Sequence, residues 1–272
     1  MASETELYAL AEACLWSPEV EDKLAATDRA AAALRAGRLT RGGGTGPRPA
    51  SEVRFPAQLR WVDPRALPRR KLGSPVGRAA FLHALAHIEF TAIHLAFDMA
   101  YRFRDLPEDF SYDWLQVAIE EAAHFRALRR RLRDFGCDYG ELPVHRGLWE
   151  LAERTACDPL PRLALVPRGM EAHGLDVTPG LIAKLKALGD GETALILERI
   201  LEDEIGHVRL GSLWFRRLCQ QRGRDPESEY FALLERHGGA PGSAPLNHAA
   251  RRAAGFSDTE LARLKATRAT AP

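Results

Sequence analysis

The sequence predicts an all-α protein built around a bundle of four long helices. Four long segments repeat apolar residues at helical spacing, and no segment shows the alternation of apolar and polar residues that is typical of a strand. Capping and helix-breaking residues stand at the ends of these segments. The chain has 272 residues, which is long enough for a substantial buried core.

The first 75 residues are predicted to form an arm that precedes the bundle. An alanine-rich segment over residues 4–36 has the pattern of two short helices around Ser17-Pro18. A stretch rich in glycine and proline follows over residues 42–49, and residues 50–75 are rich in proline and arginine. We therefore expect a helical arm and then an irregular linker.

The four bundle helices follow, with a helical cap after them. We expect Gly174 to end the third helix as its C-cap, and Pro167 to kink it. The long helices are predicted at residues 76–104, 112–135, 159–173 and 192–222, and shorter ones at residues 147–155, 178–188, 227–237 and 258–267. The predicted division is residues 1–75 for the arm, 76–222 for the bundle and 223–272 for the cap.

Composition and charge exclude several classes of protein. With 38 basic and 37 acidic residues the net charge is +1, so no global field attracts nucleic acid or an anionic membrane. The N-terminus lacks the pattern of a signal peptide, and no run reaches the roughly 18 apolar residues of a membrane span. The four cysteines form no CxxC pair and are interpreted as reduced thiols. These features predict a cytoplasmic protein without a membrane segment.

The motif Glu-x-x-His occurs in two of the long helices. It comprises Glu121 with His124, and Glu204 with His207. Residues three apart lie on one face of a helix, so both side chains of a pair can bind the same metal or neighbouring metals. Both pairs fall in the middle of an apolar stripe, where an ionised carboxylate costs several kcal/mol unless it is paired or bound to metal.

The other two long helices each carry one acid in phase with their apolar stripe. These acids are Glu89 in the first helix and Glu171 in the third. One Glu from each of two helices, with Glu-x-x-His from each of the other two, is the pattern of di-iron and di-manganese carboxylate proteins with a ferritin-like bundle. The predicted metal ligands are therefore Glu89, Glu121, His124, Glu171, Glu204 and His207. By analogy with such centres, Glu121 and Glu204 should bridge two metals, while Glu89 and Glu171 should be terminal ligands.

Simpler explanations exist for single residues. Any one of these acids, Glu171 above all, is also explained by a helix cap, a salt bridge to an arginine or a misjudged helix face. His83, His87, His94 and Asp98 line a second face of the first helix. They form a second metal site or polar contacts to the arm, or His87 hydrogen-bonds a metal ligand. The arginine run 126–133, at the end of the second helix, is either a solvated face or a contact to a phosphate-bearing substrate.

Four strings of this sequence resemble a known family. They are residues 87–89, 120–125, 170–177 and 203–208, which surround the predicted ligands. They resemble an uncharacterised bacterial ferritin-like family, a domain of unknown function that is distantly similar to tRNA-hydroxylating non-haem di-iron monooxygenases. The resemblance implies a carboxylate-bridged centre of two iron ions, or manganese, and chemistry with dioxygen.

The function that follows is an oxygen-dependent oxidase or hydroxylase of unknown substrate. The arm and the cap would shape a substrate pocket, and Gly206 and Gly211 would leave room beside the metals. Such an enzyme would act on dioxygen and a small molecule or tRNA, with electrons from a reductase partner. Two alternatives stay open: a ferroxidase or other metal-handling ferritin-like protein, and a metal-stabilised binding protein without turnover.

Overall fold

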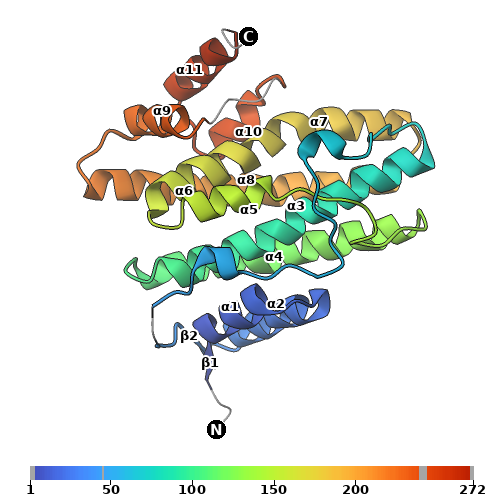
Figure 1. Ribbon diagram of the computed structural model, residues 1–272. Helices are drawn as coiled ribbons and strands as arrows, with labels where there is room; N and C mark the ends of the chain where they lie inside the picture. The colour runs from blue at the N-terminus through green and yellow to red at the C-terminus, as the bar shows by residue number, and fades with distance from the viewer. Residues whose placement is uncertain (1–3, 45, 239–243, 270–272) are drawn as a thin grey trace. The chain divides into compact units, whose positions relative to one another are not determined.

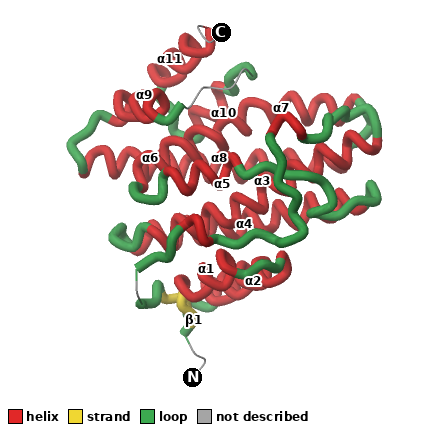
Figure 2. Tube along the Cα trace, in the orientation of Figure 1, coloured by secondary structure: helices red, strands yellow, loops and turns green. Residues whose placement is uncertain are grey.

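The computed structural model describes residues 4–44, 46–238 and 244–269 of the chain. Apart from loops and turns, the secondary structure of these residues is almost entirely helical (Figure 2). The strands in the described part are two-residue pieces, β1 (Thr5–Glu6) and β2 (Leu39–Thr40), which pair in parallel. The prediction of an all-α protein is confirmed at the level of class.

The chain divides into two compact units, residues 1–156 and residues 157–272. Each unit contains its own pair of long helical segments that pack against each other. The predicted division into arm, bundle and cap stays a prediction.

The first unit is organised around α3 (Pro75–Arg102) and α4 (Glu108–Arg133), which pack against each other as a hairpin (Figure 1). The side chain of Ser74 caps α3 by accepting a hydrogen bond from the Gly77 amide at 3.1 Å. The predicted helices at residues 76–104 and 112–135 are thus present, and α4 begins earlier, directly after Pro107. The smaller elements are α1 (Leu7–Trp16), α2 (Val20–Arg35), α5 (Gly147–Arg154) and the 3-10 turns η1 (Ala50–Glu52) and η2 (Pro64–Ala66).

The two short helices predicted within residues 4–36 are α1 and α2, which pack against each other and against the α3–α4 hairpin. A buried lysine on α2, Lys23, ties this region together. Its ammonium donates to the carbonyl of Cys14 at 2.6 Å and to that of Arg54 at 2.8 Å, so one side chain links α1, α2 and the linker. Burial lowers the pKa of Lys23 to about 8.

By its length and composition alone, α3 could cross a membrane. However, 83% of its most apolar window is buried inside the structure. A long, largely apolar helix that is mostly covered by protein is typical of a core helix. The cytoplasmic location predicted from the sequence stays a prediction.

The second unit contains one long, interrupted helix that packs against α8 (Gly191–Gln221). The interrupted helix consists of α6 (Pro159–Leu165), a π-helical turn η3 (Val166–Glu171) and α7 (Ala172–Ala187). Three helices follow: α9 (Pro226–Arg236), α10 (His248–Ala253) and α11 (Asp258–Ala269). α9 packs on α6 and α8, and α10 packs on α7 and α8. The predicted helices at residues 192–222, 227–237 and 258–267 are present, while α10 was not predicted.

The prediction that Gly174 ends a helix is wrong. The chain continues as α7 through Gly174 and Pro179, and the separate helix predicted at residues 178–188 is the end of α7. Gly174 does not have the positive φ of a glycine that terminates a helix. The distortion predicted at Pro167 is present, and it takes the form of the wide turn η3.

Candidate metal centre

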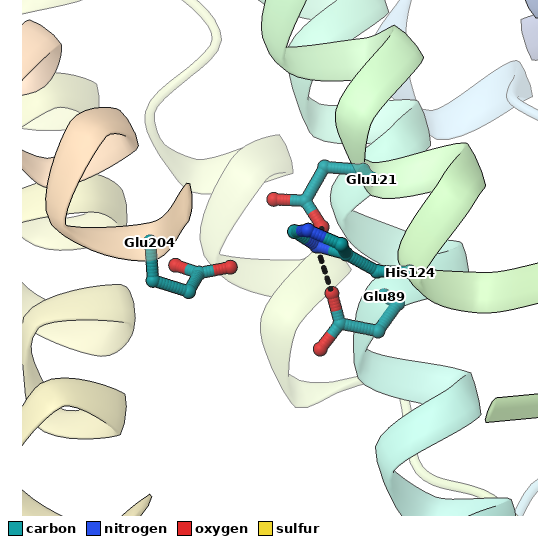
Figure 3. Close-up of side chains that lie close together, drawn as sticks. All are labelled: Glu89, Glu121, His124 and Glu204. Carbon is teal, nitrogen blue, oxygen red and sulfur yellow. Dashed lines mark hydrogen bonds and ion pairs between the residues drawn. The ribbon is translucent and has the colours of Figure 1, made fainter. Parts of the chain in front are cut away.

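Three of the predicted ligands come together in the first unit. Glu89 lies in the middle of α3, and Glu121 and His124 lie on the facing side of α4 (Figure 3). The Nδ1 atom of His124 lies 3.3 Å from Oε2 of Glu89 and 3.4 Å from Oε2 of Glu121. One ligand atom from each of the three residues lies within 4.8 Å of the others, which is close enough to bind one metal ion.

Helical periodicity explains this arrangement. Glu121 and His124 stand three residues apart, so α4 presents both on the same face, and Phe125 and Leu128 continue that face as buried residues. On α3, Glu89 lies among buried residues that include Phe90 and Ile93. The hairpin therefore brings the three polar side chains together inside an apolar environment.

Burial and charge strongly perturb this cluster. Glu121 is completely buried, and Glu89 and His124 are nearly so. Burial, and then the negative charge of Glu121, raise the pKa of Glu89 well above its ordinary range. Burial alone would lower the pKa of His124, but hydrogen bonds to Glu121 and Glu89 raise it to about 11. Without a cation the cluster therefore retains protons, and strongly perturbed titratable groups of this kind are typical of functional sites.

The second unit contains the other Glu-x-x-His pair and the remaining predicted ligand. Oε1 of Glu204 and Nδ1 of His207 lie 3.6 Å apart on one face of α8. His207 is buried and Glu204 is partly exposed. Glu171 is the last residue of the π-helical turn η3. Each unit thus provides two carboxylates and one imidazole of the predicted set.

The histidines on the second face of α3 make contacts within the first unit. Both ring nitrogens of His87 have partners: the Tyr139 hydroxyl at 2.9 Å from Nδ1, and the carbonyl of His145 at 3.1 Å from Nε2. His83 accepts a hydrogen bond from the Gly140 amide at 3.0 Å. These bonds engage both ring nitrogens of His87 and the Nε2 atom of His83.

His94 contacts the linker through its ring and not through a polar atom. Its ring stacks on Phe55 at 4.6 Å between centroids, and its Nδ1 lies 2.7 Å from the carbonyl of Phe90. Asp98, four residues further along α3, accepts hydrogen bonds from Arg102 at 2.6–3.0 Å. On this face His83, His87 and Asp98 thus make polar contacts, while His94 packs against Phe55 through its ring.

The arginine run at the end of α4 is largely engaged in ion pairs. Arg126 bonds to Asp28 of α2 at 2.8 Å, and Arg129 bonds to Asp138 at 2.8 Å. Two further pairs join Arg131 to Asp134 and Arg133 to Asp138, at 2.9 and 2.8 Å. These contacts support the interpretation of a solvated, salt-bridged face that also anchors α2.

Three buried residues were missed by reasoning from the sequence. Tyr139 lies in the connection after α4, yet its hydroxyl reaches His87 and its ring packs on Phe90 and Phe125, with centroids 5.0 and 5.1 Å away. Lys23 and Arg168 are charged but almost inaccessible to solvent. No sequence signal identifies them, because their partners are distant along the chain.

The fold and the cluster define an all-α protein with a buried group of glutamate and histidine side chains that can hold a metal ion. Oxygen and imidazole donors of this kind suit iron, manganese or zinc.

The chain belongs to the family described as "Protein of unknown function (DUF455)", whose model matches residues 16–262. It is 42% identical over 214 residues to a protein of Haemophilus influenzae described as uncharacterized, and the match covers 76% of this chain and 74% of that protein. No solved structure matches the chain significantly. The expectation of a family of unknown function is therefore confirmed. Its ferritin-like character and its distant similarity to tRNA-hydroxylating monooxygenases stay predictions.

Proposed function

We propose that this chain is a ferritin-like, non-haem di-metal protein that uses dioxygen to oxidise or hydroxylate a substrate. The observation that carries the proposal is the buried cluster of Glu89, Glu121 and His124, together with the second Glu-x-x-His pair on α8. Two carboxylates and an imidazole in each unit supply the full set of donors for a two-metal centre.

The donor set fits divalent iron or manganese. In the proposed centre, Glu89, Glu121, Glu171 and Glu204 would hold the metals through their carboxylates, together with His124 and His207. Four carboxylates balance the charge of two divalent cations, and two imidazoles complete the coordination. A site of this kind leaves positions open, unlike a closed structural zinc site, and iron in it supplies the capacity to react with dioxygen.

In this proposal the residues around the metals exclude water and hold the ligand-bearing helix α3 in place. The apolar residues around the cluster exclude water from the reactive positions, which limits side reactions. Tyr139 and the His145 carbonyl fix the ring of His87, two residues before Glu89, and so stiffen α3 beside the site. Electrons would come from a reductase partner, and the substrate is a small molecule or tRNA. The tRNA alternative rests on the distant resemblance alone and stays a proposal.

The test is metal analysis of the purified full chain, followed by anaerobic reduction and exposure to air. The proposal predicts two iron or manganese ions per chain and, for iron, a ferric absorption band in the near ultraviolet after exposure. A protein that takes up no metal, or that binds zinc alone, would contradict it.

The same experiment separates the alternatives. Rapid oxidation of many added ferrous ions per chain, with a large cage detected by light scattering, would favour metal handling. A bound metal that neither reduces nor reacts with dioxygen would favour a binding protein without turnover.

A further inference from the structure

The long helix that carries Glu171 depends on the C-terminal helices for part of its backbone hydrogen bonding. Pro179 lies inside α7 and has no amide hydrogen, so it cannot donate to the carbonyl of Leu175 four residues earlier. The side chain of Asn247, at the start of α10, donates to that carbonyl at 3.2 Å. A residue far along the chain thus compensates for the proline.

Two further side chains of the C-terminal helices donate to carbonyls on either side of Glu171, the proposed metal ligand. The hydroxyl of Tyr230, on α9, donates to the carbonyl of Arg168 in η3 at 2.9 Å. The guanidinium of Arg251, on α10, donates to the carbonyl of Ala172 at 3.0 Å. Glu171 lies between these two carbonyls, so side chains of the C-terminal helices fix the backbone immediately around it.

The side chain of Arg168 links the turn η3 to the C-terminal helices. It is 1% exposed and forms an ion pair with Glu260 of α11, which is also buried. The rings of Phe215, Tyr230 and Phe256 surround the guanidinium, at 4.5–5.1 Å from their centroids. A buried charge is strongly disfavoured once its partner is removed, so the pair holds η3 and α11 together.

Glu260 is itself held in place by the start of α11. Its carboxylate accepts a hydrogen bond from the Ser257 amide at 2.9 Å, and the Ser257 hydroxyl accepts one from the Glu260 amide at 3.0 Å. This reciprocal pair is a capping box. The carboxylate that Arg168 binds is therefore preorganised by the helix that carries it.

We propose that Arg168 is a positioning residue for Glu171, and that the C-terminal helices, through it, set the occupancy of one of the two metal positions. Arg168 and Glu171 share the six-residue π-helical turn, so a shift of one moves the other. Irregular turns of this kind hold their shape only when surrounding contacts impose it. The inference rests on the proposed metal centre and identifies residues that tune it without binding metal.

The test is titration of the metal-free full chain with Co²⁺ under anaerobic conditions, read by visible absorption and by counting bound ions. The variants are Arg168→Met, Arg168→Lys and Tyr230→Phe. Tyr230→Phe removes a single hydroxyl, so it provides a folded test even if Arg168→Met does not fold. Leu185→Ala is the matched control, because it removes side-chain volume at a fully buried position near the end of α7 that lies far along the helix from η3.

The wild-type chain should bind two Co²⁺ ions. Arg168→Met should bind one ion as the wild type does and the second at least tenfold more weakly, and Arg168→Lys should recover part of that loss. Tyr230→Phe should weaken the second ion in the same direction, while Leu185→Ala should retain both ions despite its lower stability. If Arg168→Met, or Tyr230→Phe in its place, binds both ions with wild-type affinity, the positioning role is excluded and the metal centre stands. A wild-type chain that does not bind two ions would overturn the metal centre and this inference with it.

Discussion

The ring of Pro167 lies directly against Gly211 of α8. A Cβ atom added at Gly211 would stand 2.5 Å from both Cβ and Cγ of Pro167, far inside van der Waals contact. The role expected for Gly211, to leave room beside the metals, is therefore corrected: Gly211 accommodates the proline of the π-helical turn. This contact sets how closely η3 approaches α8 within the second unit.

Substitution of Gly211 by alanine should destabilise the protein by about 1–3 kcal/mol, because the added methyl group forces η3 away from α8. Urea denaturation of the metal-free chain measures this free energy. Gly180→Ala is the matched control, since Gly180 is exposed on α7 and its Cβ would meet nothing within 4 Å. That control should be neutral or more stable by up to about 1 kcal/mol. A Gly211→Ala protein as stable as the wild type would show that the contact is not tight in solution.

Replacing Glu121 by glutamine should separate stability from metal binding. In the metal-free protein Glu121 repels Glu89 but also pairs with the buried imidazolium of His124, so Glu121→Gln removes an unfavourable and a favourable interaction together and should change the free energy of unfolding by no more than about 1–2 kcal/mol. The same change removes a ligand atom and should weaken metal binding at least tenfold. Glu120→Gln, on the adjacent and partly exposed position, should alter neither property. Unfolding curves and metal titrations of both variants provide the measurement, and equal metal affinity in Glu121→Gln would exclude this residue as a ligand.

Replacing Glu204 by alanine tests the contribution of the second unit. The purified variant should contain less metal than the wild type, because a proposed ligand is lost. Glu202→Ala removes an exposed carboxylate two residues away on the same helix and should retain wild-type content. Elemental analysis of the wild type and the two variants measures the metal content of each protein. Unchanged metal content in Glu204→Ala would exclude Glu204 as a ligand.

The buried histidine His83 should make the protein sensitive to mild acid. Burial lowers its pKa from 6.5 to about 4, while the acids Glu141 and Asp138 oppose this shift. Between pH 6.5 and pH 4 the unfolded chain takes up a proton that the folded chain does not, so stability falls as the pH decreases through this window. The loss amounts to about 3 kcal/mol at most.

His83→Gln should reduce that dependence and flatten the curve of unfolding free energy against pH over the same window. His248→Gln, which removes an exposed histidine, serves as the control. Denaturant unfolding at several pH values between 4 and 7 measures the slopes. Identical slopes in wild type and His83→Gln would contradict the account of this residue.

Much of the helical structure and part of the site follow from periodicity in the sequence. Glu121 and His124 share a helix face in any α-helix, and Glu89 could be selected because it is the acid in phase with the apolar stripe of α3. The spacing of these three residues was therefore sufficient to predict the donor groups of the first cluster.

Other features depend on tertiary contacts that no local pattern contains. Gly174 and Pro179 indicate a helix end by local rules, but Asn247 and Arg251 of α10 stabilise a continuous helix there. The ion pair between Arg168 and Glu260 joins residues that are distant in the sequence. Such pairs form only once the C-terminal helices have packed on α6–α8, which is why they escaped prediction.

The central claim is that one protein chain holds two metal ions between its four carboxylates and two imidazoles. Anomalous diffraction from crystals of the Mn²⁺-loaded protein tests it most directly. We expect two anomalous peaks per chain about 3.5–4 Å apart, with ligands drawn from Glu89, Glu121, His124, Glu171, Glu204 and His207. A single ion bound by Glu89, Glu121 and His124 alone, or metal bound elsewhere on the chain, would contradict it.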